Sequence, residues 1–421
     1  MRGARRVSWP GDREGKGVDY GWVILVSSFL ITSVGYGATY SFGLFFKPLQ
    51  GEFGWTAAEA SVIFSLYMFS YCLFGTASGW AVDRFGPRVT TVCGGLLVGS
   101  GLLLSNRVHA LWHIYVTYGL LAGAGMSTFY TPLLTTASRW FPHKQGMALG
   151  VVSSGIGVGT FLGPLVFGYF ISSYGWRTAY LIGGTAIGSI AITLGLLLKR
   201  DPTGTVGRPC AGPDSAASDP GQGDPTFRRV VASRPFWLFS VIYFLVGFGL
   251  QMMIAHVVPY IQEAHRFSPS AAGAVLSTIG MASFAGRLIM GTASDYIGTR
   301  RGLAISVFLE GAAVIFILLS PHPWLLFGFA ALFGFGYGGH APQFPALIRE
   351  LFGARQLGRN IGIQQVFYGL GAFLGPFLAG CLKDATGGYQ LPFALSATTL
   401  ISGAFISLAL KTPRARGMAS P

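Results

Sequence analysis

The residue with the clearest potential for chemistry is Arg287, in the stretch GMASFAGRLIMG at residues 280–291, where every other residue is uncharged. It stands eight residues before Asp295, which is roughly 12 Å along a helix. No acidic residue lies three or four positions away on either side. A guanidinium inside a bilayer costs about 2.5–3.5 kcal/mol to insert. We therefore expect Arg287 to bind a substrate carboxylate through paired hydrogen bonds, with pairing to Glu310 as the alternative.

The charge of this candidate site bears on the size and charge of the substrate. One guanidinium balances one carboxylate, whereas a dicarboxylate would leave a negative charge uncompensated in a low-dielectric site. The sequence thus favours a small monocarboxylate of the lactate or pyruvate type over oxalate. A protonated histidine would weaken this inference, because it would supply a second positive charge.

Other polar residues in apolar stretches are further candidates. His256 shares an i, i+4 stripe with Met252 and Tyr260 and is the first choice for a proton carrier. Glu310 and His340 are the other two candidates for proton coupling. The predicted substrate-binding residues, besides Arg287 and His256, are Tyr36, Tyr40, Tyr130, Ser283, Tyr337, Gln364 and Tyr368.

The elements that must position these residues are membrane spans. The chain of 421 residues is 51% hydrophobic and only 10% charged, with a mean hydropathy of +0.54. A soluble domain has roughly a quarter of its residues charged, so these values predict an integral membrane protein of helices. Twelve spans are expected, at 21–46, 59–82, 89–106, 111–138, 146–170, 178–198, 235–262, 270–294, 302–320, 323–348, 359–382 and 390–410.

The net charge of +14 is explained by topology. If both termini are cytoplasmic, 23 of the 29 lysines and arginines fall on the cytoplasmic side, as the positive-inside rule requires. The predicted location is the plasma (cytoplasmic or inner) membrane. The charge therefore implies a lipid bilayer as surroundings and no nucleic-acid partner.

An internal repeat relates the two halves of the chain at one constant offset. GWAVDRFGPR at 79–88 matches GTASDYIGTR at 291–300, and GTFLGP at 159–164 matches GAFLGP at 371–376. A duplicated six-helix unit is typical of a transporter with its site between the halves. The expected organisation is an N-terminal tail (1–18), a first bundle (19–199), a cytoplasmic linker (200–234), a second bundle (235–411) and a C-terminal tail (412–421).

The loop motif at Asp83 and Asp295, present twice, resembles the signature loop of the major facilitator superfamily. The resemblance implies an all-α membrane protein of two pseudo-symmetric six-helix bundles that rock around a central cavity. It also implies a cytoplasmic gate between the bundles, in which carboxylates cap a facing helix and pair with arginines. The gate candidates are Asp83, Arg84, Arg88, Arg139, Asp295, Arg300 and Arg349.

Three stretches narrow the resemblance to the monocarboxylate porter family, close to oxalate and formate exchangers. They are VDYGWVILVSSF at 18–29, FPHKQGMALGVVSSGIGVG at 141–159 and TFRRVVASRPFW at 226–237. Two residues depart from that family: Tyr40 stands where many animal members have lysine, and Ser283 where they have aspartate. If transport is coupled to a proton, residues other than these two must carry it.

The leading interpretation is a secondary transporter of small monocarboxylates working by alternating access, with a proton. The alternatives are an organic-anion exchanger of the oxalate/formate kind and a non-transporting sensor of the same fold. No catalytic arrangement, metal-ligand spacing or phosphate loop favours an enzyme, a metal site or a cofactor. A monomer is expected to suffice, and the sequence does not bear on an ancillary subunit.

Overall fold

A computed structural model describes residues 20–141, 145–200, 230–319, 322–353 and 357–410, and every regular element there is helical. The tails and most of the predicted linker lie outside these ranges. The first half contains α1 (Tyr20–Tyr40), α2 (Phe42–Phe53), α3 (Ala57–Ser105), α4 (Leu111–Ile114), the π-helix η1 (Tyr115–Ala122), α5 (Gly123–Met126), the 3₁₀-helix η2 (Ser127–Phe129), α6 (Thr131–Trp140) and α7 (Gln145–Leu197). The second half contains α9 (Arg234–His265), α10 (Pro269–Ile297), α11 (Thr299–Leu318), α12 (Leu325–His340), α13 (Gln343–Phe352), α14 (Leu357–Thr386) and α15 (Gln390–Ala409).

These helices account for the twelve expected spans. Eight of the described helices are long and apolar enough to cross a bilayer. Two of them, α3 and α7, each contain a reversal, at Gly86 (φ 84°) and Gly175 (φ 80°), and therefore supply two spans apiece. Glycine adopts this backbone region readily. The fourth and tenth spans are built from the shorter helices α4–α6 and α12–α13, so the predicted fold class is confirmed.

The repeat is visible in the backbone as well as in the sequence. At the offset of the sequence repeat, the turn at Gly86 recurs at Gly298 (φ 88°), and the turn at Gly175 recurs at Gly387 (φ 74°). Helix starts follow the same offset. Thr56 and Ser268 each accept a hydrogen bond from the backbone three residues on.

Three spans that the sequence predicts as single helices are interrupted. The first breaks at Ser41, the fourth at Tyr130 (φ −127°, ψ −78°), and the tenth between His340 and Gln343. Tyr130 and Pro342, at which the last two breaks fall, occupy equivalent positions in the two repeats. Interrupted helices at the centre of a transporter leave backbone and side chains free for a binding site.

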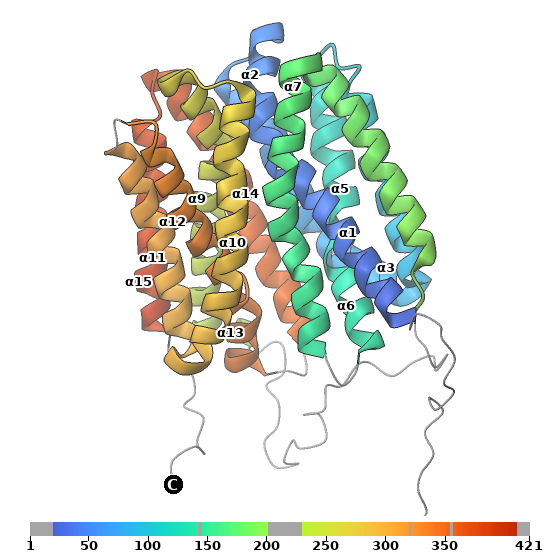
Figure 1. Cartoon of the computed structure of the whole chain (residues 1–421). Helices are drawn as coiled ribbons and strands as arrows, with labels where there is room; N and C mark the ends of the chain where they lie inside the picture. Colours follow the sequence, from blue (N-terminus) through green and yellow to red (C-terminus); the bar gives the residue numbers. More distant parts are fainter. Residues whose placement is uncertain (1–19, 142–144, 201–229, 320–321, 354–356, 411–421) are drawn as a thin grey trace, which may run out of the picture.

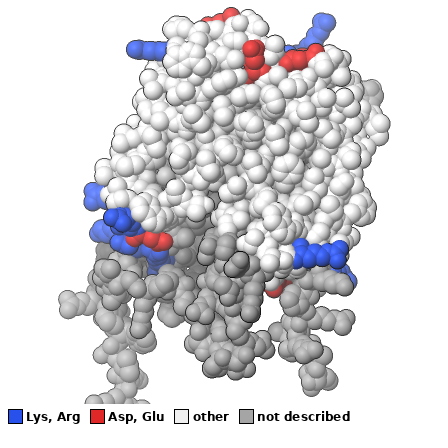
Figure 2. Space-filling model, turned by 180° about the vertical axis from the view of Figure 1, so that it is seen from behind, with Lys and Arg blue, Asp and Glu red and all other residues white. Residues whose placement is uncertain are grey.

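The helices form two bundles that meet along three lines of contact (Figure 1). Helix α3 packs against α14, α7 packs against α10, and α2 packs against α9. Figure 2 shows that lysine, arginine, aspartate and glutamate lie at the two ends of the molecule, with an uncharged band between them. Such a band is what a bilayer core requires of the surface.

Two names identify these ends below. The Asp83 end contains Asp83, Arg139 and Arg300, and the ends of α6 and α13 mark it at the bottom of Figure 1. The Asp384 end contains Asp384 and Glu263, and α2 marks it at the top.

Candidate functional site

A cavity of about 140 Å³ lies between the two bundles. Its lining comes from both halves and includes Tyr130 and Ala341 at the interruptions of the fourth and tenth spans, and Tyr40 next to that of the first. Its walls are mainly aromatic, with one guanidinium and one imidazole. Its tyrosines are Tyr36, Tyr40, Tyr67, Tyr71, Tyr130, Tyr243, Tyr337 and Tyr368, and its other polar or charged residues are Thr39, Gln251, Arg287, His340 and Gln365.

Arg287 of α10 is the cation of this cavity. Its Nη1 donates to Ser283 Oγ at 3.3 Å, and its guanidinium carbon lies 5.3 Å from the centre of the Tyr337 ring. In the part of the chain that the structure describes, no carboxylate forms an ion pair with Arg287. A partly buried guanidinium in this setting keeps donors available for a bidentate anion.

Glycines on α10 and α12 bring Arg287 to the cavity wall. The backbone of Ser283 contacts Gly338, and a Cβ on Gly286 would lie 3.0 Å from the carbonyl carbon of Phe335. The two helices therefore approach more closely than side chains would permit. This packing fixes the position of Arg287 relative to Tyr337 and His340 on α12.

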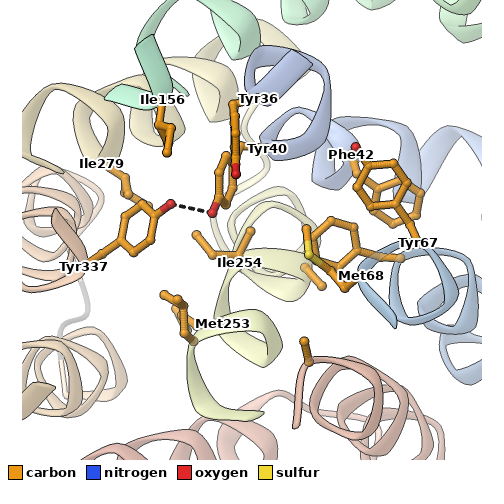
Figure 3. Packing of buried hydrophobic residues seen from close by; sticks show 14 of the residues in the cluster. Tyr36, Tyr40, Phe42, Tyr67, Met68, Ile156, Met253, Ile254, Ile279 and Tyr337 are labelled. Carbon is orange, nitrogen blue, oxygen red and sulfur yellow. Dashed lines mark hydrogen bonds between the residues drawn. The ribbon is translucent and has the colours of Figure 1, made fainter. Parts of the chain in front are cut away.

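A hydrogen bond between two tyrosines joins the bundles across the cavity. The hydroxyl groups of Tyr40 on α1 and Tyr337 on α12 are 2.5 Å apart. Figure 3 shows these side chains pointing toward each other, with Ile254 of α9 beside them. Tyr337 thus contacts both the guanidinium and the opposite bundle, and any change in the distance between the bundles must alter its contacts.

Two more pairs order the polar wall of the cavity. The hydroxyls of Tyr36 and Tyr71 are 2.7 Å apart, and Gln251 Nε2 donates to the Tyr368 hydroxyl at 2.8 Å. The other amide atom of Gln251, Oε1, is buried and has no hydrogen-bond partner among the described residues. The cavity therefore offers hydroxyl and amide groups for the polar end of a small solute.

Behind the cavity wall lies a buried ionisable pair. Glu310 Oε1 of α11 is 2.5 Å from His340 Nδ1. His340 lines the cavity, whereas Glu310 lies beyond it and is fully buried. The alternative prediction, that Glu310 pairs with Arg287, is wrong, because the Glu310 carboxylate contacts the His340 imidazole. Within the described ranges no cluster of three His, Cys, Asp or Glu residues is arranged for a metal ion.

Three predicted binding residues lie outside the cavity lining. Ser283 is one layer behind, as a partner of Arg287. His256 is buried nearer the Asp384 end, with Nε2 3.0 Å from both Ser61 Oγ and the Pro376 carbonyl. Gln364 is fully buried without a hydrogen-bond partner among the described residues. The neighbouring Gln365 faces the cavity in its place.

Sequence reasoning did not select several lining residues. Tyr67 and Tyr71 form an i, i+4 pair on α3, the same signal that selected Tyr36 and Tyr40 on α1. Tyr243 and Gln251 of α9 had no such signal, because almost all of that helix is buried and its cavity face is not distinct in the sequence.

The gate candidates lie at the Asp83 end, and Asp83, Arg84 and Arg300 each contact residues of their own bundle. Asp83 pairs with Arg139 of α6 at 2.8 Å. Arg300 donates to the Leu410 carbonyl at 2.7 Å, and Arg84 lies over the Trp80 ring at 5.5 Å. Arg88 and Arg349 are exposed, and the side chain of Asp295 is outside the described residues. The inter-bundle role of this set stays a prediction.

The Asp384 end has polar contacts between the bundles. Asp384 of α14 accepts hydrogen bonds from the backbone N–H groups of Ala57 and Ala58, at 2.8 and 2.7 Å, and so caps the start of α3. Glu263 of α9 pairs with Lys47 of the first half and, at 2.8 Å, with Lys383 of the second. The bundles are therefore fastened together on this side of the cavity.

Comparisons with known proteins agree with this architecture. The sequence pattern of the Major Facilitator Superfamily matches residues 28–264 and 239–420. Monocarboxylate transporter 13 of Bos taurus is 28% identical, over 93% of this chain and 89% of that protein. Monocarboxylate transporter 11 of Homo sapiens is 29% identical, over 96% and 85% respectively.

Solved structures of low sequence identity share the fold. A bacterial homolog to the human lysosomal transporter Spinster, in an inward-facing and occupied conformation, has a TM-score of 0.74 at 17% identity, covering 93% of this chain and 97% of that one. A mutant of the nucleoside transporter NupG has a TM-score of 0.72 at 13% identity, covering 93% and 99%.

Proposed function

Because this chain belongs to the Major Facilitator Superfamily and is a multi-pass membrane transporter, we propose that it carries small monocarboxylates of the lactate or pyruvate type together with a proton. The observation that carries the proposal is Arg287, a guanidinium facing a central cavity with no described carboxylate partner. The relatives of this chain described above are monocarboxylate transporters.

The size of the cavity supports a solute of a few heavy atoms. A protein cavity of about 150 Å³ accommodates benzene, which has as many non-hydrogen atoms as lactate or pyruvate. The cavity here is about 140 Å³. Oxalate is of similar size, so the preference for monocarboxylates rests on the single guanidinium and not on volume.

Alternating access is supported by the polar contacts that join the bundles at the Asp384 end. We propose that these contacts close that end, so that the substrate enters and leaves on the Asp83 side in this conformation. The positive-inside count assigns the Asp83 side to the cytoplasm. We therefore interpret the structure as an inward-facing state in the plasma membrane with both termini inside. A monomer contains the whole cavity.

Uptake by the purified protein in proteoliposomes tests this function. Labelled lactate, pyruvate, formate and oxalate are offered with and without an inward proton gradient. We expect lactate or pyruvate to accumulate with the gradient, and Arg287→Ala to abolish this uptake. Arg107→Ala is a matched control, because Arg107 is exposed and is not part of the cavity lining.

The exchanger alternative predicts a different pattern in the same experiment. Uptake would then require a counter-substrate inside the vesicles, and the proton gradient would have no effect. Normal uptake by Arg287→Ala would refute the carboxylate site itself. Failure of every carboxylate to enter would refute the proposed substrate class and favour a sensor.

A further inference from the structure

The buried pair of Glu310 and His340 has no part in anchoring the carboxylate, yet it adjoins the site where the carboxylate would bind. Glu310 is 0% exposed and His340 is 4% exposed. Glu310 Oε2 has no hydrogen-bond partner among the described residues. We infer that this pair is the proton site of the transporter and that it holds one proton for each carboxylate on Arg287. The inference rests on the proposed function.

Close packing of α11 and α12 builds the pair. A Cβ on Gly336 would lie 2.8 Å from Glu310 Cγ, and one on Gly339 would lie 2.6 Å from Ser306 Oγ. Only glycine permits this approach, which presses the carboxyl group against the imidazole and excludes water from its far side. His340, which lines the cavity, is the route by which a proton reaches Glu310.

Few other ionisable groups surround the pair. The Tyr337 ring lies 5.7 Å from the His340 ring, and α13 contributes Phe344, at 5.2 Å. The charged residues of α13, Arg349 and Glu350, are exposed at the Asp83 end, and residues 390–410 of the adjoining span contain no titratable group. Besides Arg287 on α10, the titratable groups that line the described cavity with His340 are all tyrosines, and Tyr337 on α12 is the one in ring contact with it.

Tyr337 connects the proton site with the anion site. The centre of its ring is 5.3 Å from the Arg287 guanidinium carbon and 5.7 Å from the centre of the His340 ring. The two sites are therefore neighbours in the same bundle, within the range at which charges interact strongly in a low-dielectric medium.

Charge balance then links the proton to the carboxylate. Without ligands, an ionised Glu310 beside neutral His340 offsets Arg287, and the site is neutral. With a monocarboxylate on Arg287 and one proton shared between Oε1 and Nδ1, the site is neutral again. Either ligand alone leaves an unbalanced charge in a largely buried site, which disfavours reorientation. The proton enters from water on the open side and returns to water on the other.

Two kinds of flux separate this proton site from the substrate site. Full-length protein in proteoliposomes is assayed with labelled lactate for exchange at equal pH and for accumulation driven by a pH gradient. For one proton per lactate, a gradient of one pH unit supports about tenfold accumulation, because each unit is a tenfold change in proton activity. Glu310→Gln and His340→Gln should both lose this accumulation. Glu310→Gln, whose side chain lies outside the cavity lining, should retain exchange within about threefold of wild type, since the amide preserves most hydrogen bonds.

A binding measurement supplies a second readout. Lactate added to the detergent-solubilised wild type in weak buffer should draw about one proton from solution for each lactate bound, by linkage. The two variants should draw none. Glu350→Gln is the matched control, because it removes an exposed carboxylate outside the cavity and should behave as wild type.

The outcomes are decisive in each direction. If both variants still accumulate lactate and take up a proton, the assignment is wrong while the proposed function stands. Loss of exchange in a folded Glu310→Gln protein also overturns it, because Glu310 would then belong to the substrate site. A Glu310→Gln protein that does not fold leaves the decision to His340→Gln. A wild type that transports no monocarboxylate refutes the proposed function itself.

Discussion

The two halves of this protein have similar backbone conformations but differ in charge. The turns, the N-caps and the break in the fourth and tenth spans recur at equivalent positions of the repeat, whereas the arginine, glutamate and histidine at the cavity occur in the second half alone. The first half contributes neutral tyrosines. Where the second half has Arg287, Glu310 and His340, the first has Gly75, Val98 and Thr128.

This difference has a mechanical meaning. When the bundles rock against each other, groups within one bundle keep their mutual distances. Arg287 and the Glu310–His340 pair therefore keep their electrostatic interaction in every conformation, while the tyrosine wall of the first half moves. The duplication thus supplies two bodies, of which one holds the charges and the other opens and closes around them.

The largest test of this asymmetry compares substitutions at equivalent positions. Arg287→Ala should reduce the initial rate of lactate uptake by at least about 30-fold, because losing one partner of a buried charged pair costs about 2–5 kcal/mol. Gly75→Ser should transport nearly normally, since a Cβ there meets nothing within 4 Å. Arg287→Lys, which keeps the charge but not the bidentate geometry, should lose about tenfold.

Equal losses at positions 75 and 287 would mean that both halves contribute to anion binding, and the asymmetry would not hold. Expression and a melting curve for each variant show whether a loss is due to unfolding.

The next test removes the hydrogen bond between Tyr40 and Tyr337 from either side, one hydroxyl at a time. Tyr337→Phe should raise KM for lactate by about tenfold and Tyr40→Phe by about threefold, because a net hydrogen bond contributes about 0.5–1.5 kcal/mol and Tyr337 also contacts Arg287. A double-mutant cycle measures their coupling. A larger increase in KM for Tyr40→Phe than for Tyr337→Phe would mean that the first half contributes more to lactate binding.

A smaller effect is expected where the halves are fastened. Asp384→Asn weakens the cap on α3, which is worth about 0.5–2 kcal/mol, and should populate longer distances between spin labels across the Asp384 end. The matched variant Asp83→Asn should weaken closure at the Asp83 end and so the outward-open state. Identical distance distributions for wild type and both variants would contradict these roles.

The smallest effect is expected at the second buried histidine. His256→Gln should retain pH-driven accumulation within about twofold of wild type, because its ring lies outside the cavity lining and an amide can still donate to the Pro376 carbonyl. If His256→Gln loses pH-driven accumulation while His340→Gln retains it, His256 and not His340 is the proton carrier.

Much of the fold was predictable from local information. Hydrophobic length set the twelve spans, and the paired motifs at Asp83 and Asp295 revealed the duplication. The comparisons confirm the resemblance to the major facilitator superfamily and to monocarboxylate porters. The interruptions at Tyr130 and Ala341 were not predicted, because an apolar run has no periodicity that reports a break.

The site was predictable where a single residue conflicts with its surroundings. Arg287 is conspicuous in hydrocarbon whatever its neighbours, and the structure places it at the cavity. Gln364 and Gln365 differ by one residue, or about 100° around the helix, and composition does not say which of the two faces inward. The choice between His256 and His340 is of the same kind.

By itself the sequence determined the number of spans, the duplication and the presence of one uncompensated cation, because these depend on hydrophobicity and residue type along the chain. Only the tertiary structure decided that Glu310 contacts His340 and not Arg287, and that Asp384 caps α3. The reason is that these contacts join residues on separate helices, whose rotation and depth are fixed by packing. In α11 and α12 that packing depends on where glycine allows two backbones to meet.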